Sequence, residues 1–139
     1  MSIAKIMSTR VVSVHMDDSL QSLRELFAAT GFHHLVVVHD NKLRGIISDR
    51  DLLKSISPFV DTLSERKLDR ATLDRKAHQI MTREVITLNP SDSVYSAIEL
   101  FNTHKISCIP IIDTNRLPVG MVSWRDVMKF MQSRVEAKR

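Results

Sequence analysis

The sequence is poor in cysteine, glycine, proline and long apolar runs. Its single cysteine, Cys108, excludes an internal disulfide and a zinc site built from cysteines. The longest uninterrupted apolar runs have four residues, as in Leu35 to Val38, whereas a membrane-spanning helix needs about 20. The N-terminus also lacks the apolar stretch of a signal peptide. These absences predict a cytoplasmic protein with no membrane partner.

Three glycines and four prolines in 139 residues are few for an all-β protein with many tight turns, so substantial helix is expected. The hydrophobic fraction of 43% can build a core, which excludes a disordered chain and predicts one compact domain. Lysine and arginine number 20 against 16 acidic residues, and they are scattered. A net charge of +4 leaves nucleic-acid binding only as a weak alternative, and we expect no nucleic-acid partner.

The chain repeats itself. Ile6 to Val14 matches Ile80 to Leu88 at an offset of 74, and Gly45 to Lys54 matches Gly120 to Lys129 at an offset of 75. Such self-similarity indicates two copies of one structural unit. The copies are assigned to residues 1–60 and 77–139, with a charged connector at 61–76. The connector region is expected to be solvated and to contain one or two helical turns.

Each copy has the pattern β-α-β-β-α. We expect strands at Val11–Val14, His34–His39 and Gly45–Ile47, and in the second copy at Val85–Leu88, Cys108–Ile112 and Gly120–Val122. The polar segments Asp17 to Ser19 and Pro90 to Ser93 suit helix N-caps, and the helices that follow should have buried stripes at i, i+3, i+4 and i+7. Gly31 is suited to end the helix of the first copy. The fold class is therefore α/β in the α+β sense, with two copies packed by pseudo-twofold symmetry because ~60 residues bury too little alone.

The motif G-h-h-S-x-R-D, where h is apolar, occurs in both copies and could carry a binding function. A serine that ends a strand and opens a helix lies beside unpaired backbone N–H groups, which suit a phosphate. An aspartate three residues later can accept hydrogen bonds from a ribose, and the arginine suits phosphate oxygens. The alternative is structural, since Ser-x-x-Asp also resembles a helix capping box. The residues are Ser48, Arg50 and Asp51, and in the second copy Ser123, Arg125 and Asp126.

Two segments, IMTREVITLNPSDSVYSAIELFNTHKISCIPIID and GMVSWRDVMK, resemble a CBS domain, and the two copies resemble a tandem CBS pair, or Bateman module. The resemblance covers Ile3 to about Met131. It implies two clefts between the repeats that bind adenosine-containing ligands: AMP, ADP or ATP, with NAD and S-adenosylmethionine as further candidates. The sequence has no G-x-S-x-G, Walker A or H-E-x-x-H motif, so we expect no enzyme activity and no required cofactor. Magnesium is expected only as an ion carried in on a nucleotide.

Carried over by position, the aspartates Asp51 and Asp126 would hold ribose, and the serines Ser48 and Ser123 would contact phosphate beside Arg50 and Arg125. The adenine would lie against the chain entering the first strand and against the approach to the second strand. The chain entering the first strand supplies Thr9, Arg10 and Val11 in the first copy and Arg83, Glu84 and Val85 in the second. The approach to the second strand supplies His34 in the first copy and Ile106, Ile109 and Pro110 in the second. Which of the two clefts is occupied stays open. Pro110 fits the family pattern, whereas the first copy has Val36 there. Trp124 lies inside the second motif.

Other signals are weaker. The histidines His33, His34 and His39 alternate faces and lack zinc spacing, so no metal site is expected. Cys108 is expected to be a half-buried thiol. A C-terminal helix at Trp124–Lys138 carries an apolar stripe that could cover a second copy, as the resemblance to a family of paired modules implies. The leading interpretation is a ligand sensor acting through a homodimer or an unknown effector protein. The alternative is a structural interaction module with non-functional clefts.

Overall fold

The structure, a computed structural model, describes all 139 residues and divides into two compact units. The first-repeat unit is Val12–Val85, and the second-repeat unit combines Met1–Val11 with Ile86–Arg139. The N-terminal segment therefore belongs with the second repeat rather than the first. No helix is long and apolar enough to cross a membrane.

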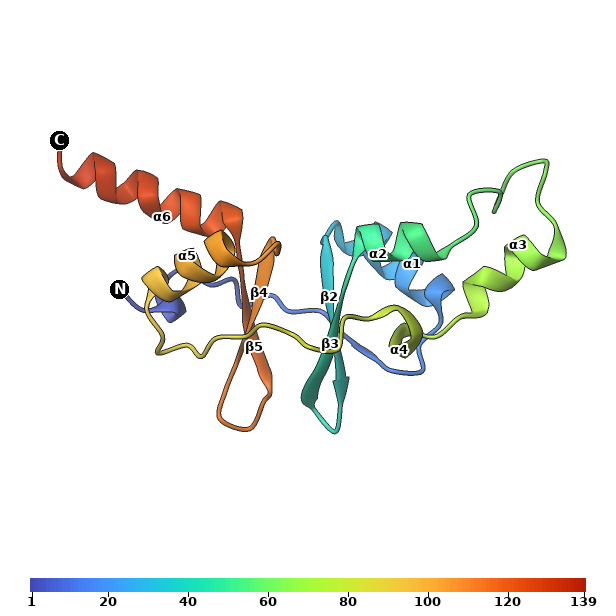
Figure 1. Ribbon diagram of the computed structural model, residues 1–139, viewed down its shortest axis with the longest axis horizontal. Coiled ribbons are helices and arrows are strands. Elements are labelled where there is room, and N and C mark those ends of the chain that lie inside the picture. The colour runs from blue at the N-terminus through green and yellow to red at the C-terminus, as the bar shows by residue number, and fades with distance from the viewer. The chain divides into compact units, whose positions relative to one another are not determined.

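The first-repeat unit has the expected β-α-β-β-α order. Its elements are β1 (Ser13–His15), α1 (Leu20–Thr30), β2 (His34–His39), β3 (Lys42–Ser48) and α2 (Asp49–Ser55). The sheet order is β1-β2-β3, with β1 parallel and β3 antiparallel to β2. Asp40 and Asn41 both have positive φ, as a two-residue hairpin turn requires. Helices α1 and α2 lie on the same side of this hairpin (Figure 1).

The second-repeat unit contains η1 (Ile3–Lys5), α5 (Val94–Thr103), β4 (Cys108–Ile112), β5 (Pro118–Ser123) and α6 (Trp124–Ala137). The strand expected at Val85–Leu88 is reduced to one parallel bridge, between Leu88 and Ile111. Proline explains the loss. In the first repeat the Val36 amide donates to Val12 O at 3.1 Å, and the matching residue here, Pro110, has no N–H to donate.

Serine caps begin α1 and α5, each within the polar segment that the sequence predicts. The Oγ atoms of Ser19 and Ser93 accept from backbone amides three residues later, each at 3.2 Å. Gly31 ends α1 in the left-handed conformation, with φ of 71°. The predicted apolar stripes fill the two cores. Their buried members are Leu20, Leu23 and Phe27 in α1, and Val94, Ala97 and Phe101 in α5.

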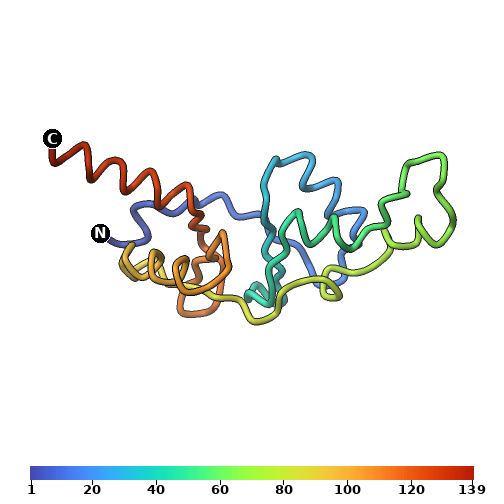
Figure 2. Tube along the Cα trace, turned by 45° about the horizontal axis from the view of Figure 1, so that its top comes forward, coloured from blue at the N-terminus to red at the C-terminus, as the bar shows by residue number.

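The opening segment of each repeat packs in the unit of the other repeat. In the second-repeat unit, Ile3 N donates to Asp92 O at 2.7 Å, and the equivalent bond in the first-repeat unit joins Ala77 N to Asp18 O at 2.8 Å. Figure 2 shows the blue N-terminal segment beside the orange α5. Ala77 opens α4 (Ala77–Ile80), which belongs to the first-repeat unit. Because each repeat contributes its opening segment to the unit of the other repeat, the two units have equivalent contacts.

The connector contains the expected helical turns, as α3 (Lys67–Ala71) and η2 (Thr72–Asp74). It is less solvated than its charge pattern indicates, because Leu73 is buried and Asp69 is only 6% exposed. Asp69 accepts from the Ser57 hydroxyl at 2.8 Å and from the Arg66 amide at 2.8 Å. These donors stabilise the carboxylate and lower the pKa of Asp69.

Candidate functional site

The G-h-h-S-x-R-D motif of the first repeat forms the turn from β3 into α2, here named the Ser48 corner (Ser48, Arg50, Asp51). Ser48 caps the helix, and its Oγ accepts from the Asp51 amide at 3.1 Å. Asp51 Oδ2 accepts in return from the Ser48 amide at 2.9 Å. These reciprocal bonds complete a capping box. The structural role that the sequence allowed for this pair is therefore present.

The second repeat builds the same turn from β5 into α6, here named the Ser123 corner (Ser123, Arg125, Asp126). Ser123 Oγ accepts from the Asp126 amide at 3.4 Å, and Asp126 Oδ2 accepts from the Ser123 amide at 2.8 Å. The Ser123 hydroxyl also lies 3.1 Å from the same Oδ2. In both corners the bonded carboxylate oxygen is Oδ2. The second oxygen of each aspartate takes no part in the capping box.

The segment that enters the first strand of each repeat pairs with the strand that leads into the corner of the other repeat. Thr82 exchanges backbone hydrogen bonds with Ile46 of β3, two residues before Ser48, at 3.1 and 2.9 Å. Ser8 pairs in the same way with Met121 of β5, two residues before Ser123, at 2.8 and 2.9 Å. Both bridges are antiparallel, so the chain that follows each bridge starts out along the strand in the direction away from the corner. The contact of Thr9, Arg10, Val11, Arg83, Glu84 and Val85 with a ligand stays a prediction.

The two motif glycines allow the opening segment of the other repeat to approach the strand closely. A Cβ at Gly45 would lie 2.5 Å from the Sδ of Met81, and a Cβ at Gly120 would lie 2.6 Å from the Sδ of Met7. Both methionines come from the Ile-Met-Ser/Thr opening of the other repeat. Two motifs that the sequence presents separately are therefore halves of one contact. The signal in the sequence for this contact is a small residue in one motif that can face a methionine in the other. The spacing of the two motifs along the chain does not predict that they meet.

The approach to the second strand joins each corner from the other side. His34 is the register partner of Ser48, and Cys108 is the partner of Ser123. The amide of Asp49 donates to His33 O at 2.9 Å, and the amide of Trp124 donates to Ser107 O at 3.3 Å. Two residues expected near the ligand, Ile109 and Pro110, are fully buried.

The two corners differ in electrostatics. Beside Ser48, His33 Nδ1 lies 2.8 Å from Asp49 Oδ2, and this hydrogen bond lowers the pKa of Asp49. Burial lowers the pKa of neighbouring His34, because it penalises the charged imidazolium. The Ser48 corner therefore combines two carboxylates, Asp49 and Asp51, with two histidines.

Beside Ser123 the environment is aromatic and apolar. Trp124 takes the position of Asp49, its ring centroid lies 5.6 Å from that of Phe101, and its Nε1–H donates to Ile106 O at 3.0 Å. Burial, with a further contribution from the charge of Asp126, raises the pKa of Cys108 to about 12. The tryptophan is thus held in place against the approach segment. No group of three or more His, Cys, Asp or Glu side chains is arranged to hold a metal ion.

Comparison with known proteins identifies the family. The CBS domain model matches residues 3–58 and 77–133. A CBS domain-containing protein of Dictyostelium discoideum is 29% identical over 131 residues, which cover 93% of this chain and 90% of the relative. A homoserine O-acetyltransferase of Methanosalsum zhilinae is 30% identical over 131 residues. The match covers 94% of this chain but only 24% of the acetyltransferase.

Solved structures show the same arrangement of elements. The CBS domain pair of protein MJ0100, in complex with 5′-methylthioadenosine and S-adenosyl-L-methionine, matches with a TM-score of 0.76 at 25% identity. The match covers 96% of this chain and 98% of that one. The repeat, the two units and these comparisons agree, and the chain belongs to the CBS domain family as a tandem pair.

Proposed function

We propose that this protein is a regulatory module that binds an adenosine-containing ligand at its Ser48 and Ser123 corners and passes the occupancy on to a partner protein or a homodimer interface. The observation that carries the proposal is the duplicated corner itself. In both copies a serine hydroxyl meets an aspartate that keeps one carboxylate oxygen outside the capping box, and an arginine lies between them in the sequence. The adenosine ligands of the MJ0100 domain pair support the ligand class.

Each group has a chemical role suited to this ligand. The second oxygen of Asp51 or Asp126 accepts from a ribose hydroxyl while Oδ2 keeps the helix capped. A phosphate or carboxylate of the ligand is attracted by Arg125 and by the N-terminus of the fourteen-residue α6. Ile106 and the entering residues 9–11 form the surface for the adenine. None of these roles needs bond chemistry, so the module acts by binding and not as an enzyme.

The charges at the two corners shape which adenosine ligand is preferred. Asp49 adds a second carboxylate at the Ser48 corner, where the second repeat has the neutral Trp124. A phosphate is therefore repelled more strongly at the Ser48 corner, unless magnesium arrives with it. Methylthioadenosine, which is neutral, and S-adenosylmethionine, which carries a sulfonium, fit that corner better than AMP, ADP, ATP or NAD. We expect the nucleotides to prefer the Ser123 corner.

Signalling follows from a difference in affinity. A ligand shifts the protein between conformations only to the extent that it binds one of them more tightly. We place this output in the cytoplasm, through a homodimer or an effector protein.

Isothermal titration calorimetry tests the proposal with S-adenosylmethionine, methylthioadenosine, AMP and ATP. We expect saturable binding of at least one ligand, weakened roughly tenfold or more by Asp51→Ala or Asp126→Ala, since each removes a charge-assisted hydrogen bond. Both substitutions also break a helix cap, which costs about 1 kcal/mol. Ser93→Ala breaks a matched cap on α5 outside the motif and should leave the affinity unchanged.

The alternative, a structural module, has one observation in its favour: the capping boxes already account for both serine–aspartate pairs. If none of the four ligands binds at about millimolar concentration, this alternative is correct and the sensor proposal is wrong. Binding that Ser93→Ala weakens as much as Asp126→Ala would likewise contradict the assigned roles.

A further inference from the structure

A histidine–aspartate pair lies at the Ser48 corner and has no counterpart at the Ser123 corner. His33 Nδ1 lies 2.8 Å from Asp49 Oδ2, and the Asp49 amide donates to His33 O at 2.9 Å, so side chain and backbone hold the two residues together. Both side chains stay accessible to a ligand, with exposed fractions of 78% and 41%. The second repeat has Ser107 and Trp124 at the matching positions. The His33–Asp49 pair is therefore a chemical difference between two corners of the same construction.

His34 brings a second imidazole to this corner, because it is the register partner of Ser48. Burial lowers the pKa of this ring and favours its neutral form. The charged and titratable groups that act on it are Asp49, Asp51, His33 and Arg50. His33 is exposed, whereas His34 is half-buried, and histidine is the side chain whose charge changes between pH 5 and 8. The ring of His33 is thus the one placed to exchange a proton beside Asp49.

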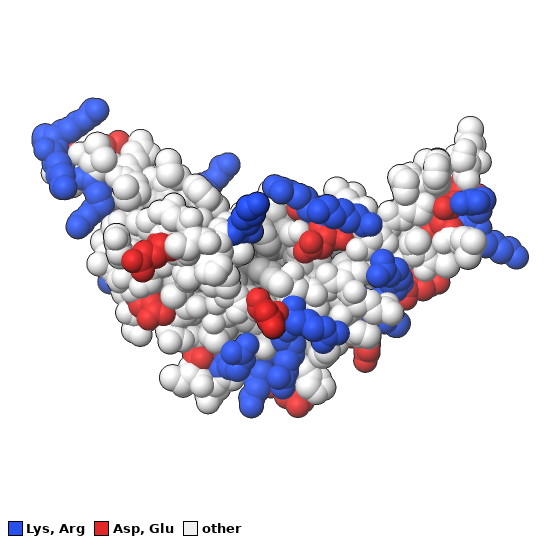
Figure 3. Space-filling model, in the orientation of Figure 1, with Lys and Arg blue, Asp and Glu red and all other residues white.

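The net charge of the corner depends on that proton. Two carboxylates and one guanidinium leave one net negative charge while both imidazoles are neutral, and a proton on His33 cancels it. The entering segment that pairs with β3 adds one charge of each sign, at Arg83 and Glu84. Basic and acidic side chains are interspersed over much of the surface that Figure 3 shows. Because salt screens exposed charges that lie more than about 10 Å apart, the groups next to a ligand determine the field that it meets.

The ligand contributes a charge of its own through the group on the 5′ carbon of its ribose. In the proposed function this group meets Ser48, and Asp49 is the next residue along the chain. A phosphate there attracts a proton to the neighbouring imidazole, whereas a sulfonium repels it. Methylthioadenosine has a neutral thioether at the same position and does neither.

We propose that the His33–Asp49 pair determines the ligand specificity of the Ser48 corner, where a phosphate ligand binds with uptake of a proton by His33 and S-adenosylmethionine binds with release of one. The proton comes from the solvent or returns to it, and no bond of the ligand is made or broken. The Ser123 corner lacks both residues, and the neighbouring Cys108 thiol, with a pKa of about 12, keeps its proton. The inference rests on the proposed function, because it concerns the regulation of the same site.

Proton-linked calorimetry tests the proposal on the full chain. Titrations at pH 6.5 in PIPES and in Bis-Tris, two buffers with different ionisation enthalpies, give the number of protons exchanged per ligand. The parent chain carries Asp126→Ala, which weakens the Ser123 corner, and the ligands are AMP, S-adenosylmethionine and methylthioadenosine. A tenfold change in the proton affinity of one imidazole moves about half a proton near its midpoint.

The substitution His33→Gln in the parent chain isolates the contribution of the imidazole. Glutamine keeps a hydrogen-bond donor for Asp49, and the comparison cancels the ionisation of the ligand itself. The parent should take up roughly 0.3 to 0.5 more protons than His33→Gln with AMP, and release as many more with S-adenosylmethionine. Methylthioadenosine should show no difference.

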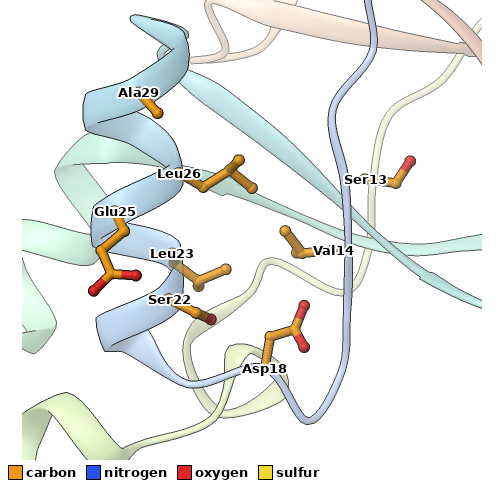
Figure 4. A pocket seen from close by; sticks show the side chains of 8 residues that line it. All are labelled: Ser13, Val14, Asp18, Ser22, Leu23, Glu25, Leu26 and Ala29. Carbon is orange, nitrogen blue, oxygen red and sulfur yellow. The ribbon is translucent and has the colours of Figure 1, made fainter.

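Two further variants of the parent test the role of the carboxylate. Asp49→Asn should strengthen AMP binding and weaken S-adenosylmethionine binding by roughly threefold or more at pH 7.5, because it removes a negative charge next to the ligand. Glu25→Gln is the matched control, since Glu25 is an exposed carboxylate of the same unit. It lies on α1 at the groove between α1 and β1 (Figure 4), whose lining contains no residue of the Ser48 corner. Glu25→Gln should leave affinities and proton numbers unchanged.

The possible failures are distinguishable. Equal proton numbers in the parent and His33→Gln, the same sign for AMP and S-adenosylmethionine, or an equal effect of Glu25→Gln would overturn the inference while the proposed function stands. Binding of methylthioadenosine alone, or of ligands only when Asp126 is intact, would have the same consequence. No saturable binding of any of the three ligands, even to the chain with Asp126 intact, would overturn the proposed function itself.

Discussion

The substitution Gly120→Ala tests the crosswise packing of the two repeats. The new Cβ would lie 2.6 Å from Met7 Sδ, 3.1 Å from Met7 Cγ and 3.0 Å from the backbone oxygen of Ser8. Two of these three atoms belong to one flexible side chain, and the third belongs to a β-bridge that cannot easily move. Overpacking of this kind costs about 1–3 kcal/mol. We expect Gly120→Ala to lower the free energy of unfolding by an amount in that range.

A double-mutant cycle then identifies the partner. Met7→Ala removes both side-chain atoms that clash, so the pair Gly120→Ala/Met7→Ala should be more stable than the sum of the single effects by about 1–2 kcal/mol. Met81 is the equivalent methionine but packs on Gly45, so Gly120→Ala/Met81→Ala should be additive within about 0.5 kcal/mol. Urea unfolding at equilibrium measures all five variants. Coupling of Gly120 to Met81 instead of Met7, or additivity with both, would refute the exchange of opening segments.

Three further predictions concern single residues. The pKa of the Cys108 thiol is raised from 9.0 to about 12. At pH 8 the thiol should therefore react with a disulfide reagent roughly a thousandfold more slowly in the native than in the unfolded protein. Labelling of the native protein as fast as in urea would contradict this. His34 has a lowered pKa, so its contribution to stability is complete above its ordinary value of 6.5 and is lost as the pH falls below it. Thermal unfolding between pH 7.5 and 5.5 should show a smaller loss for His34→Gln than for the native chain, and an equal loss would argue against burial of this ring. Gly31→Ala should destabilise the protein by about 1 kcal/mol in urea unfolding, because a φ of 71° is costly for alanine. Steric crowding does not contribute, since no atom lies within 4 Å of the new Cβ. An unchanged stability would show that α1 ends in another conformation.

The sequence predicts the local features of the fold well. The bounds of β2 and β4, the caps at Ser19 and Ser93 and the left-handed Gly31 depend on neighbouring residues, which a periodic pattern with its flanking signals captures. The lost strand at Val85–Leu88 could also have been found. Pro110 has no amide hydrogen for the pairing that Val36 makes, and this difference between the copies is visible in the sequence.

The exchange of opening segments could not be predicted in the same way. It joins Met7 to Gly120 and Met81 to Gly45, and no local rule decides which of the two equivalent glycines a methionine meets. The corners raise a related problem. Ser48 and Asp51 make a capping box whether or not a ligand binds, because the carboxylate has two oxygens and the cap uses one. Sequence pattern therefore locates the candidate site but does not choose between its two roles.

Chemical-shift mapping tests the central claim most directly, because it reports where an adenosine ligand binds on the intact chain. The ¹H–¹⁵N spectrum would be followed during titration with S-adenosylmethionine and, separately, with AMP. The account predicts saturable shifts in the amides of the two corners and of the entering segments, at Ser48 to Asp51, Ser123 to Asp126, and residues 9–11 and 83–85. Amides of the connector at α3 should not move. Shifts confined to other parts of the chain, or no shifts at millimolar ligand, would contradict it.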